Sequence, residues 1–475
     1  MILLQQLRCL CLILLFAGTV TLGAEPKNLT VTKVMKTKVD VGMTIKGRWG
    51  TFINGKSYQQ TPLDTHKGWQ YTTYYDQKRR LSIARRKLPD GAWQVIHFDD
   101  YLFKGNDNHN VTVLGICRKD GTIHLAFDHH NDPLHYRVSK SGVASDPNKV
   151  EWNASLFSKV RNWLQPQKRI EKFTYPIFVP APDGNLLFFS RLGVPTNGRV
   201  RMASYDPESG GWSDKREVTT NEGDYKFEGK TSVSRYAYLN GIHYGPDGRL
   251  HMSWSWREKM GRAIRDLSYA YSDDHGRTWH NSVGKKIGGK DELIGAESPG
   301  VKVWDISPLN GLELMMGQYV DGLDRPHIII THRRDGEEPF GLGVRHEDRS
   351  AYYHYWRDEK GKWHQNEVFH PVGGGPDSER NRAKILSTPN NDLIAMFNNK
   401  ASIVLMRATA KNEYRDWKVI HKEKGPWNGE PLPDLSRWRE EGVLSIYVQK
   451  NPTKDGEPTD LYIVDFYVSA TVKSK

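Results

Sequence analysis

Histidine, tyrosine and arginine side chains recur in pairs at matching places in three consecutive stretches of the chain. Each pair has one member just before a strand-like run and the other at the end of the next run. The pairs are His109 with His129, Tyr175 with Arg191, and Tyr238 with Arg257. Imidazole and phenol groups transfer protons when their surroundings adjust their pKa values, and guanidinium groups bind carboxylates through paired hydrogen bonds. If the three stretches share one local structure, all three pairs point to the same place.

These side chains suit β-elimination on a uronic acid. Arg191 would pair with the substrate carboxylate and stabilise the enolate-like charge that develops there. Tyr175 or His109 would remove the proton at C-5, and a second imidazole or phenol would protonate the departing glycosidic oxygen. A free phenol has a pKa of about 10, and we expect neighbouring arginine cations to lower the pKa of the tyrosine. The sequence shows neither a Ser–His–Asp pattern nor a convincing pair of acid and base carboxylates.

Short β-type runs, rich in aromatic and β-branched residues and separated by Gly, Asp and Asn, must position these side chains. Seven units of this kind begin near Tyr71, Gly121, Gly184, Gly248, Leu312, Asn391 and Gly442. Their spacing of about 40 to 70 residues is in the range of propeller blades. We therefore predict an all-β, seven-bladed β-propeller, in which strand ends of neighbouring blades meet on one face near the axis.

Tryptophans mark the close of five units, at Trp93, Trp212, Trp279, Trp363 and Trp417. One unit ends in SDDHGRTW over residues 272–279, which has the S-x-D-x-G-x-T-W form of an Asp-box. This hairpin turn of sialidase-like propellers marks the fold and has no catalytic role. We expect the segment 31–41 to pair with the last blade and close the ring. Two β-sandwiches are the alternative, but no Pro-, Ser- or Gly-rich linker divides the chain into halves.

The N-terminus has the layout of a secretory signal peptide. Arg8 precedes the apolar run CLCLILLFAGTV, and the small residues Gly23 and Ala24 provide a cleavage site. The run is shorter than the roughly 20 residues of a membrane-spanning helix. We expect residues 1–24 to be removed, residues 25–475 to form a single propeller domain, and the product to be secreted or periplasmic. Cys117 is then the one cysteine of the mature chain, so no internal disulfide is expected.

The net charge of +12, together with 15 Trp and 22 Tyr, favours an anionic partner. Aromatic faces stack on sugar rings, and arginine binds carboxylate or sulfate. The sequence has no concentrated Lys/Arg tract of the kind that binds nucleic acid. We therefore expect an anionic polysaccharide as substrate, no nucleic-acid or membrane partner, and a monomer.

The chain resembles the BNR-repeat seven-bladed propeller family that includes ulvan lyases and rhamnose–glucuronate lyases. The resemblance is carried by NDNHN (106–110), DGTIHLAFDHH (120–130), TYPIFV (174–179), FSRLG (189–193), YLNG (238–241) and GRLHMSWSWRE (248–258). It implies that His109 and Tyr175 are the acid and base and that Arg191 neutralises the carboxylate.

The same resemblance implies that His129 and Tyr238 position the sugar, with Tyr236 close enough that the choice between the two tyrosines stays open. Arg257 and Asn108 complete the predicted substrate-binding set. The sequence thus predicts a secreted lyase that cleaves a uronic-acid-containing polysaccharide of ulvan type, sulfated or not, by β-elimination.

Two other functions remain open: an α-L-rhamnosidase or other exo-glycoside hydrolase of the same propeller family, and a non-catalytic glycan-binding propeller. In rhamnosidase-like relatives a single histidine on the opposite face has the catalytic role. His66 is considered for it, but we expect His66 to be a structural residue at a strand entry. We expect no required cofactor and no catalytic metal, and leave a structural ion open. The candidate ligands for such an ion are Cys117, His124, His243 and His251, which we expect instead to be strand residues facing the core.

Overall fold

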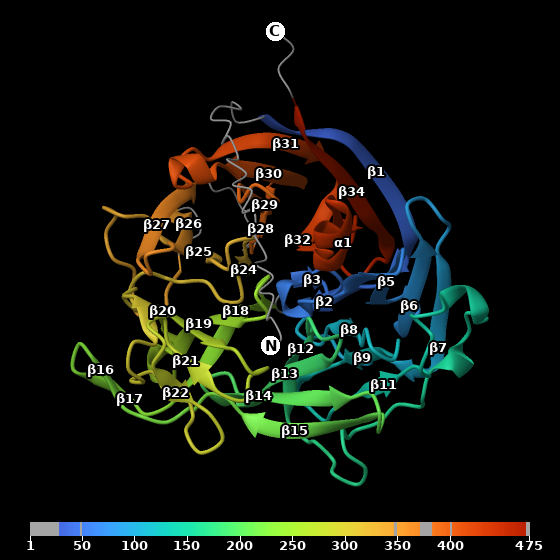
Figure 1. The fold of residues 1–475 in the computed structure, drawn as a ribbon, viewed down its shortest axis with the longest axis horizontal. Helices are drawn as coiled ribbons and strands as arrows, with labels where there is room; N and C mark the ends of the chain where they lie inside the picture. The colour runs from blue at the N-terminus through green and yellow to red at the C-terminus, as the bar shows by residue number, and fades with distance from the viewer. Residues whose placement is uncertain (1–27, 48–49, 346–348, 371–381, 400, 472–475) are drawn as a thin grey trace, which may run out of the picture.

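The computed structural model describes residues 28–47, 50–345, 349–370, 382–399 and 401–471. Within these ranges the chain forms a ring of seven β-sheets around a central axis, as Figure 1 shows. The predicted seven-bladed β-propeller is confirmed. The expected signal peptide, residues 1–24, lies outside the described residues.

Each blade runs from an inner strand at the axis to an outer strand at the rim. Blade 1 consists of β4 (Leu63–His66), β5 (Trp69–Tyr75), β6 (Arg80–Lys87) and β7 (Gln94–Leu102). Blade 2 consists of β8 (Thr112–Ile116), β9 (Ile123–Phe127) and β11 (Tyr136–Val138). Blade 3 consists of β12 (Phe173–Pro180), β13 (Leu186–Val194), β14 (Asn197–Asp206) and β15 (Gly211–Glu217), and β10 (His130–Asp132) adds to its inner edge.

Blade 4 consists of β18 (Arg235–Tyr244), β19 (Leu250–Glu258), β20 (Ile264–Ser272), β21 (Trp279–His280) and β22 (Lys286–Gly288), and β23 (Lys302–Trp304) also pairs with β20. Blade 5 consists of β24 (Gly317–Val320), β25 (Pro326–Arg333), β26 (Ser350–Arg357) and β27 (Trp363–Phe369). Blade 6 consists of β28 (Lys384–Ser387), β29 (Leu393–Asn399), β30 (Ser402–Ala408) and β31 (Lys418–Lys424). Blade 7 consists of β32 (Trp427–Pro433), β33 (Val443–Lys450), β34 (Thr459–Thr471) and β1 (Asn28–Gly42).

Short elements lie outside the blades. They are β2 (Thr44–Gly47), β3 (Gly50–Phe52), β16 (Tyr225–Phe227), β17 (Lys230–Ser232), the helix α1 (Leu435–Glu441), and the 3-10 turns η1 (Ser57–Gln59), η2 (Pro147–Lys149), η3 (Ala154–Leu156), η4 (Met260–Arg262) and η6 (Ala410–Asn412). None of the helices in the described ranges has the length and apolar character needed to cross a bilayer.

The ring closes where the two ends of the described chain meet. Strand β1 pairs antiparallel with β34 over most of its length, which confirms the prediction for residues 31–41. A fully buried ion pair joins this last blade to the first, because Arg86 of β6 lies 2.7 Å from Asp465 of β34. Arg437 of α1 binds the other oxygen of Asp465 at 2.9 Å. Breaking a buried pair strands a charge at a cost of about 3–5 kcal/mol, so these contacts stabilise the closure.

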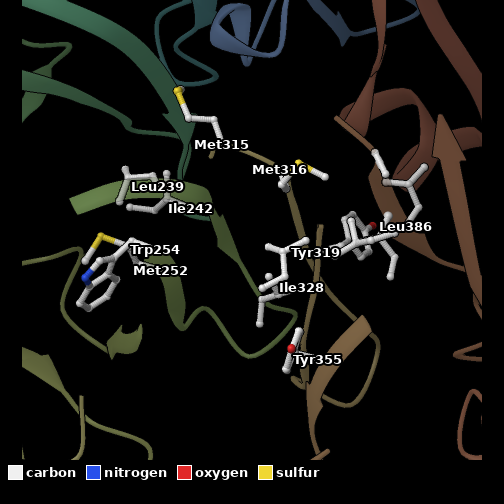
Figure 2. Packing of buried hydrophobic residues seen from close by; sticks show 14 of the residues in the cluster. Leu239, Ile242, Met252, Trp254, Met315, Met316, Tyr319, Ile328, Tyr355 and Leu386 are labelled. Carbon is white, nitrogen blue, oxygen red and sulfur yellow. The ribbon is translucent and has the colours of Figure 1, made fainter. Parts of the chain in front are cut away.

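Neighbouring blades pack face to face through apolar side chains. Figure 2 shows such packing among blades 4, 5 and 6, where Trp254, Ile328 and Leu386 belong to one cluster and are fully buried. Blades 2 and 3 approach so closely that a Cβ added at Gly115 would lie 2.3 Å from the Cβ of Phe178. Inner strands held this tightly fix the positions of the side chains at their ends.

The tryptophans predicted to close five units do lie at the starts of outer strands. Trp212, Trp279 and Trp363 lie in β15, β21 and β27, and Trp93 and Trp417 immediately precede β7 and β31. The Asp-box forms the turn between β20 and β21, where the Asp274 carboxylate accepts hydrogen bonds from the backbone N–H and hydroxyl of Thr278. It lies toward the rim, as expected for a fold marker.

One predicted strand differs from the structure. The run from Leu312 to Val320 is a strand only at Gly317–Val320, and this strand is the inner one of its blade, whereas the other six runs correspond to second strands. Among the residues before it, Glu313 still donates a backbone hydrogen bond to the Thr331 carbonyl of β25, and its side chain binds two arginines, Arg345 and Arg382.

Candidate active site

Five aromatic rings at the axis form one continuous set of contacts, which we call the aromatic arc: Tyr58, His109, His130, Tyr175 and Tyr238. The ring of His109 stacks on Tyr58 with centroids 4.4 Å apart and on His130 with centroids 4.2 Å apart. Tyr175 lies 6.3 Å from His109 and 5.8 Å from Tyr238. His109, Tyr175 and Tyr238 come from the starts of inner strands in blades 2, 3 and 4, as the repeat pattern predicted.

The second histidine of the arc is His130 and not the predicted His129. Strand β9 ends at Phe127, and Asp128 adopts a left-handed conformation with φ of 60°, which redirects the chain toward blade 3. There His130 pairs with Thr174 of β12. His129 is instead buried against Phe173, and its Nε2 accepts a hydrogen bond from the backbone N–H of His135 at 2.8 Å.

Asp107 joins the two stacked imidazoles. One carboxylate oxygen lies 2.5 Å from Nδ1 of His109 and the other 2.6 Å from Nδ1 of His130. Because a carboxylate only accepts hydrogen bonds, both Nδ1 atoms carry a proton, so Nε2 is the basic atom of a neutral His109 ring. Asp107 stands two residues before His109 in the NDNHN segment, so this proximity was visible in the sequence, although its role was not predicted.

The electrostatics favour a neutral His109. Burial lowers its pKa to about 4, and the hydrogen bond to Asp107 does not offset this penalty. Burial also disfavours the ionised carboxylate of Asp107, but the hydrogen bonds from His109 and His130 outweigh it and hold the Asp107 pKa well below its ordinary value. The ionised carboxylate of Asp107 thus orients the uncharged imidazole of His109, which can act as a base.

Tyr175 lies at an irregular point of its strand. The register of β12 against β13 shifts between Thr174 and Ile177, and Tyr175 has a φ of 53°. Bulges of this kind re-aim side chains, and left-handed backbone in a non-glycine residue costs of order 1–3 kcal/mol, which proteins retain mainly where function needs it. The strain places the phenol, which is 5% exposed, between His109 and Tyr238.

The expected lowering of the tyrosine pKa is wrong for this structure. Burial raises the pKa of Tyr175 well above its ordinary value, nearby Tyr238 raises it further, and the cation of Arg191 opposes the shift without reversing it. The guanidinium carbon of Arg191 lies 4.8 Å from the centre of the Tyr175 ring. The phenol is therefore protonated at neutral pH, which makes it a proton donor.

Two predicted arginines converge on the hydroxyl of Tyr238. Nη1 of Arg191 lies 3.5 Å and Nη1 of Arg257 lies 3.3 Å from this oxygen. Arg191 is fully buried, and its other contacts are the carbonyl of Gly193 and the hydroxyl of Thr174. Within the described residues neither arginine has a carboxylate partner. Two cations beside one another without a counter-ion form a site for an anion.

A third arginine in the same region is fully neutralised. Arg382 donates to Glu430 at 2.8 Å and to Glu313 at 2.9 Å, and both carboxylates are buried. Its Nη2 also donates to the hydroxyl of Tyr58 at 3.3 Å. Sequence reasoning missed Tyr58, Asp107 and this ion-pair network.

The remaining predicted residues lie near or away from the arc. Asn108 is buried in the turn before β8. His66 is the last residue of the inner strand β4, so it lies at the other end of the axis from Tyr175 and Tyr238, which lie near the starts of inner strands. Burial lowers the pKa of His66 to about 4, and within the described chain its buried Nε2 has no hydrogen-bond partner.

The histidines considered for a structural ion are engaged inside their blades. Nδ1 of His124 lies 2.6 Å from the hydroxyl of Tyr136, and Nδ1 of His251 lies 2.7 Å from the hydroxyl of Tyr269. Cys117 is buried, which raises its pKa to about 11, and its Sγ donates to the carbonyl of Gly184. Within the described residues, Nδ1 of His243 and Nε2 of His251 have no hydrogen-bond partner, so whether these candidates hold a structural ion stays open.

Among the described residues, one group brings three ligand atoms within 4.8 Å of one another: Asp107, His109 and His130. An imidazole nitrogen binds a metal in the plane of its ring. The His109 and His130 rings are nearly parallel, at 13°, with centroids 4.2 Å apart, so one ion does not lie in both planes. The geometry fits two hydrogen bonds to a shared carboxylate better than a metal centre.

Fold and site together define a seven-bladed β-propeller with a histidine–tyrosine–arginine site at one end of its axis. A family model described as "BNR repeat-containing family member" matches residues 69–370. The chain belongs to this BNR repeat-containing family, as its resemblance implied.

Curated relatives and solved structures agree with this placement. An "Ulvan lyase, long isoform" of Alteromonas sp. is 26% identical over 338 residues, which cover 58% of this chain and 33% of that protein. An "Ulvan lyase, short isoform" of Alteromonas sp. (strain LOR) is 25% identical over 273 residues, 47% of this chain and 50% of that protein. The chain therefore spans about a third to a half of the length of these relatives.

The crystal structure of polysaccharide lyase Uly1 superposes with a TM-score of 0.69 at 16% identity, covering 92% of this chain and 99% of that one. A PL25 ulvan lyase bound to -[GlcA(1-4)Rha3S]- superposes with a TM-score of 0.63 at 14% identity, covering 92% and 98%. These superpositions show that the propeller fold is shared.

Proposed function

We propose that this chain is an exported polysaccharide lyase that cleaves a uronic-acid-containing, ulvan-type polysaccharide by β-elimination. The observation that carries the proposal is the pair of arginines, Arg191 and Arg257, which have no carboxylate partner among the described residues and lie next to a neutral imidazole and a protonated phenol. Ulvan lyases among the relatives, and the bound glucuronate-containing ligand in one of the solved structures, support the same substrate class.

The arginines bind the uronate carboxylate in this proposal. As the C-5 proton leaves, negative charge spreads onto that carboxylate, and the guanidinium groups stabilise it more strongly than they stabilise the ground state. The hydroxyl of Tyr238 lies between the two arginines and orients them, since it is in hydrogen-bonding distance of both. Asn108 and Tyr236 would contribute to the same sugar-binding surface.

His109 and Tyr175 transfer the protons. Nε2 of His109 takes the C-5 proton, and Asp107 stabilises the imidazolium that forms. The C-5–H electron pair becomes the C-4–C-5 double bond, the C-4–O bond breaks, and the departing oxygen takes the phenolic proton of Tyr175. Exchange with water then returns both residues to their starting protonation states. No outside oxidant, reductant or cofactor enters this balance.

The test is turnover of ulvan and other uronate polymers, followed by the ultraviolet absorbance of the conjugated unsaturated product. The His109→Ala and Tyr175→Phe variants should lose turnover by a factor of about 10²–10⁴, the usual contribution of a general acid or base, while still binding the polymer. Release of sugar without the absorbing product would instead support a glycoside hydrolase. Binding by the wild type with no product of either kind would leave a glycan-binding propeller.

Export and assembly are part of the same proposal. An exported chain begins after residue 24, so N-terminal sequencing of the protein recovered outside the cytoplasm should start at Glu25. Because the site is assembled from blades of one chain, a monomer is sufficient for activity, and light scattering of the active species checks this.

A further inference from the structure

Tyr58 belongs to none of the seven blades, yet it lies in the aromatic arc. It is the middle residue of η1, in the segment that connects β3 with β4. The turn is anchored by its neighbour Gln59, which is fully buried. The side chain of Gln59 accepts a hydrogen bond from the backbone of Gly55 at 2.8 Å and donates to the carbonyl of Thr73 at 3.4 Å. The position of Tyr58 over the axis is thus fixed by its own segment and by blade 1.

The rings of Tyr58 and His130 both stack on the ring of His109. The two stacks are nearly parallel, at 15° and 13°, with centroid distances of 4.4 and 4.2 Å. The hydrogen bond from Nδ1 to Asp107 holds one atom of the imidazole and does not by itself set the plane of the ring. A ring that stacks on two nearly parallel neighbours keeps its plane, and Nε2 then keeps one direction.

The hydroxyl of Tyr58 makes a different contact. It accepts a hydrogen bond from Arg382, whose guanidinium carbon lies 4.8 Å from the centre of the Tyr58 ring. Since Arg382 is already held by Glu313 and Glu430, this bond is not needed to place the arginine. The part of Tyr58 that touches His109 is the ring, and the hydroxyl faces away toward the ion-pair network.

We propose that Tyr58 is a positioning residue, whose ring holds the imidazole of His109 in the plane required for proton abstraction. The inference rests on the proposed elimination at His109. Misplacing a catalytic group by about 1 Å can cost about 10²-fold in rate, so a residue that never touches the substrate can still control turnover.

Two variants separate the ring from the hydroxyl. Tyr58→Phe keeps the stack and should retain kcat within about threefold, whereas Tyr58→Leu removes it and should lower kcat about 10- to 100-fold, with a smaller change in KM. The acid limb of the kcat/KM profile gives a second readout. In Tyr58→Leu this limb should move to higher pH, because water reaches His109 and the effect of burial on its pKa becomes smaller. The groups that face the ring are otherwise unchanged: Asp107, His130, Tyr175 and Arg382.

A third measurement does not depend on turnover. The imidazole signals of His109, followed by NMR titration, should shift in Tyr58→Leu and stay close to wild type in Tyr58→Phe. Equal losses in both variants, or wild-type kinetics in Tyr58→Leu, would overturn the inference. If the wild type is inactive on every uronate polymer but the His109 signals still shift in Tyr58→Leu, the proposed function is wrong and the positioning role of Tyr58 stands. If the His109 signals do not shift in Tyr58→Leu, the positioning role is wrong.

Discussion

Replacing Arg191 with methionine should abolish most of the proposed cleavage and leave the fold at least as stable as before. The side chain is fully buried, and its hydrogen-bond acceptors among the described residues are all neutral, namely the Gly193 carbonyl at 3.2 Å, the Thr174 hydroxyl at 3.2 Å and the Tyr238 hydroxyl at 3.5 Å. Three long bonds of this kind are worth about 1–2 kcal/mol together. Burying an uncompensated cation costs several kcal/mol, so its removal offsets or exceeds that loss.

The effect on catalysis has the opposite sign. A unit cation about 4 Å from the developing charge contributes about 4 kcal/mol at an effective dielectric of about 20. Removal of one such electrostatic stabiliser typically costs about 10²–10³ in kcat. We expect kcat/KM of Arg191→Met to fall by about that factor. The matched change at half-buried Arg257, where water screens more of the charge, should cost about tenfold.

Arg382 is the control for stability. It is also buried beside the arc, but Arg382→Met leaves the carboxylates of Glu313 and Glu430 without that partner. Stranding buried charge costs about 3–5 kcal/mol. Urea denaturation of the wild type, Arg191→Met and Arg382→Met gives the free energy of unfolding. Initial rates of formation of the unsaturated product give kcat/KM for the same proteins. If Arg191→Met were destabilised as strongly as Arg382→Met, or kept more than a third of wild-type activity, Arg191 would not be the anion-binding cation.

Four further outcomes follow from the site and the buried histidines. Because burial lowers the pKa of His109 to about 4, the base is neutral above that pH, and kcat/KM should fall only as pH drops toward about 4; a limb near the ordinary value would contradict this. Burial lowers the pKa of His124 to about 3 and of His332 to about 4, so the stability they contribute is complete above about pH 6.5. As pH falls toward 4, these histidines take up protons in the unfolded chain and not in the folded one, so the folded state loses stability. Denaturation at several pH values should show the free energy of unfolding falling by up to about 1.4 kcal/mol per pH unit for each histidine. His66→Ala should leave the rate of elimination unchanged. Loss of all turnover in this variant would instead indicate that the catalytic site lies on the opposite face, at His66. Dialysis against a chelator should leave kcat unchanged, since Asp107 binds its two histidines by hydrogen bonds; loss restored by added metal would contradict that assignment.

The fold was predictable because its signals are local and repeat. The alternating aromatic strands and the Asp-box each depend on residues close together in the sequence. Once the units are equivalent, Tyr175 and Tyr238 must lie at equivalent places in adjacent blades. This is why the predicted tyrosines and Arg191 lie together in the structure.

What could not be predicted depends on departures from the repeat. His129 and His130 differ by one residue, and the left-handed backbone at Asp128 decides which of them reaches His109. Tyr58 lies outside every blade and so carries no periodic signal. The protonation of Tyr175 depends on how deeply the ring is buried, and the charge of Arg191 is no measure of that burial.

The arrangement of arginines explains how one molecule maintains both the ring and the site. At the seam between first and last blades, Arg86 is paired with Asp465, and beside the arc Arg382 is paired with two glutamates. These pairs stabilise the scaffold because each cation has its anion inside the protein. Arg191 and Arg257 have no carboxylate partner in the part of the chain that the structure describes, so they reduce the stability of the fold and gain most from a substrate carboxylate. A cation left without a partner in an otherwise compensated core therefore identifies where the charged group of a substrate belongs.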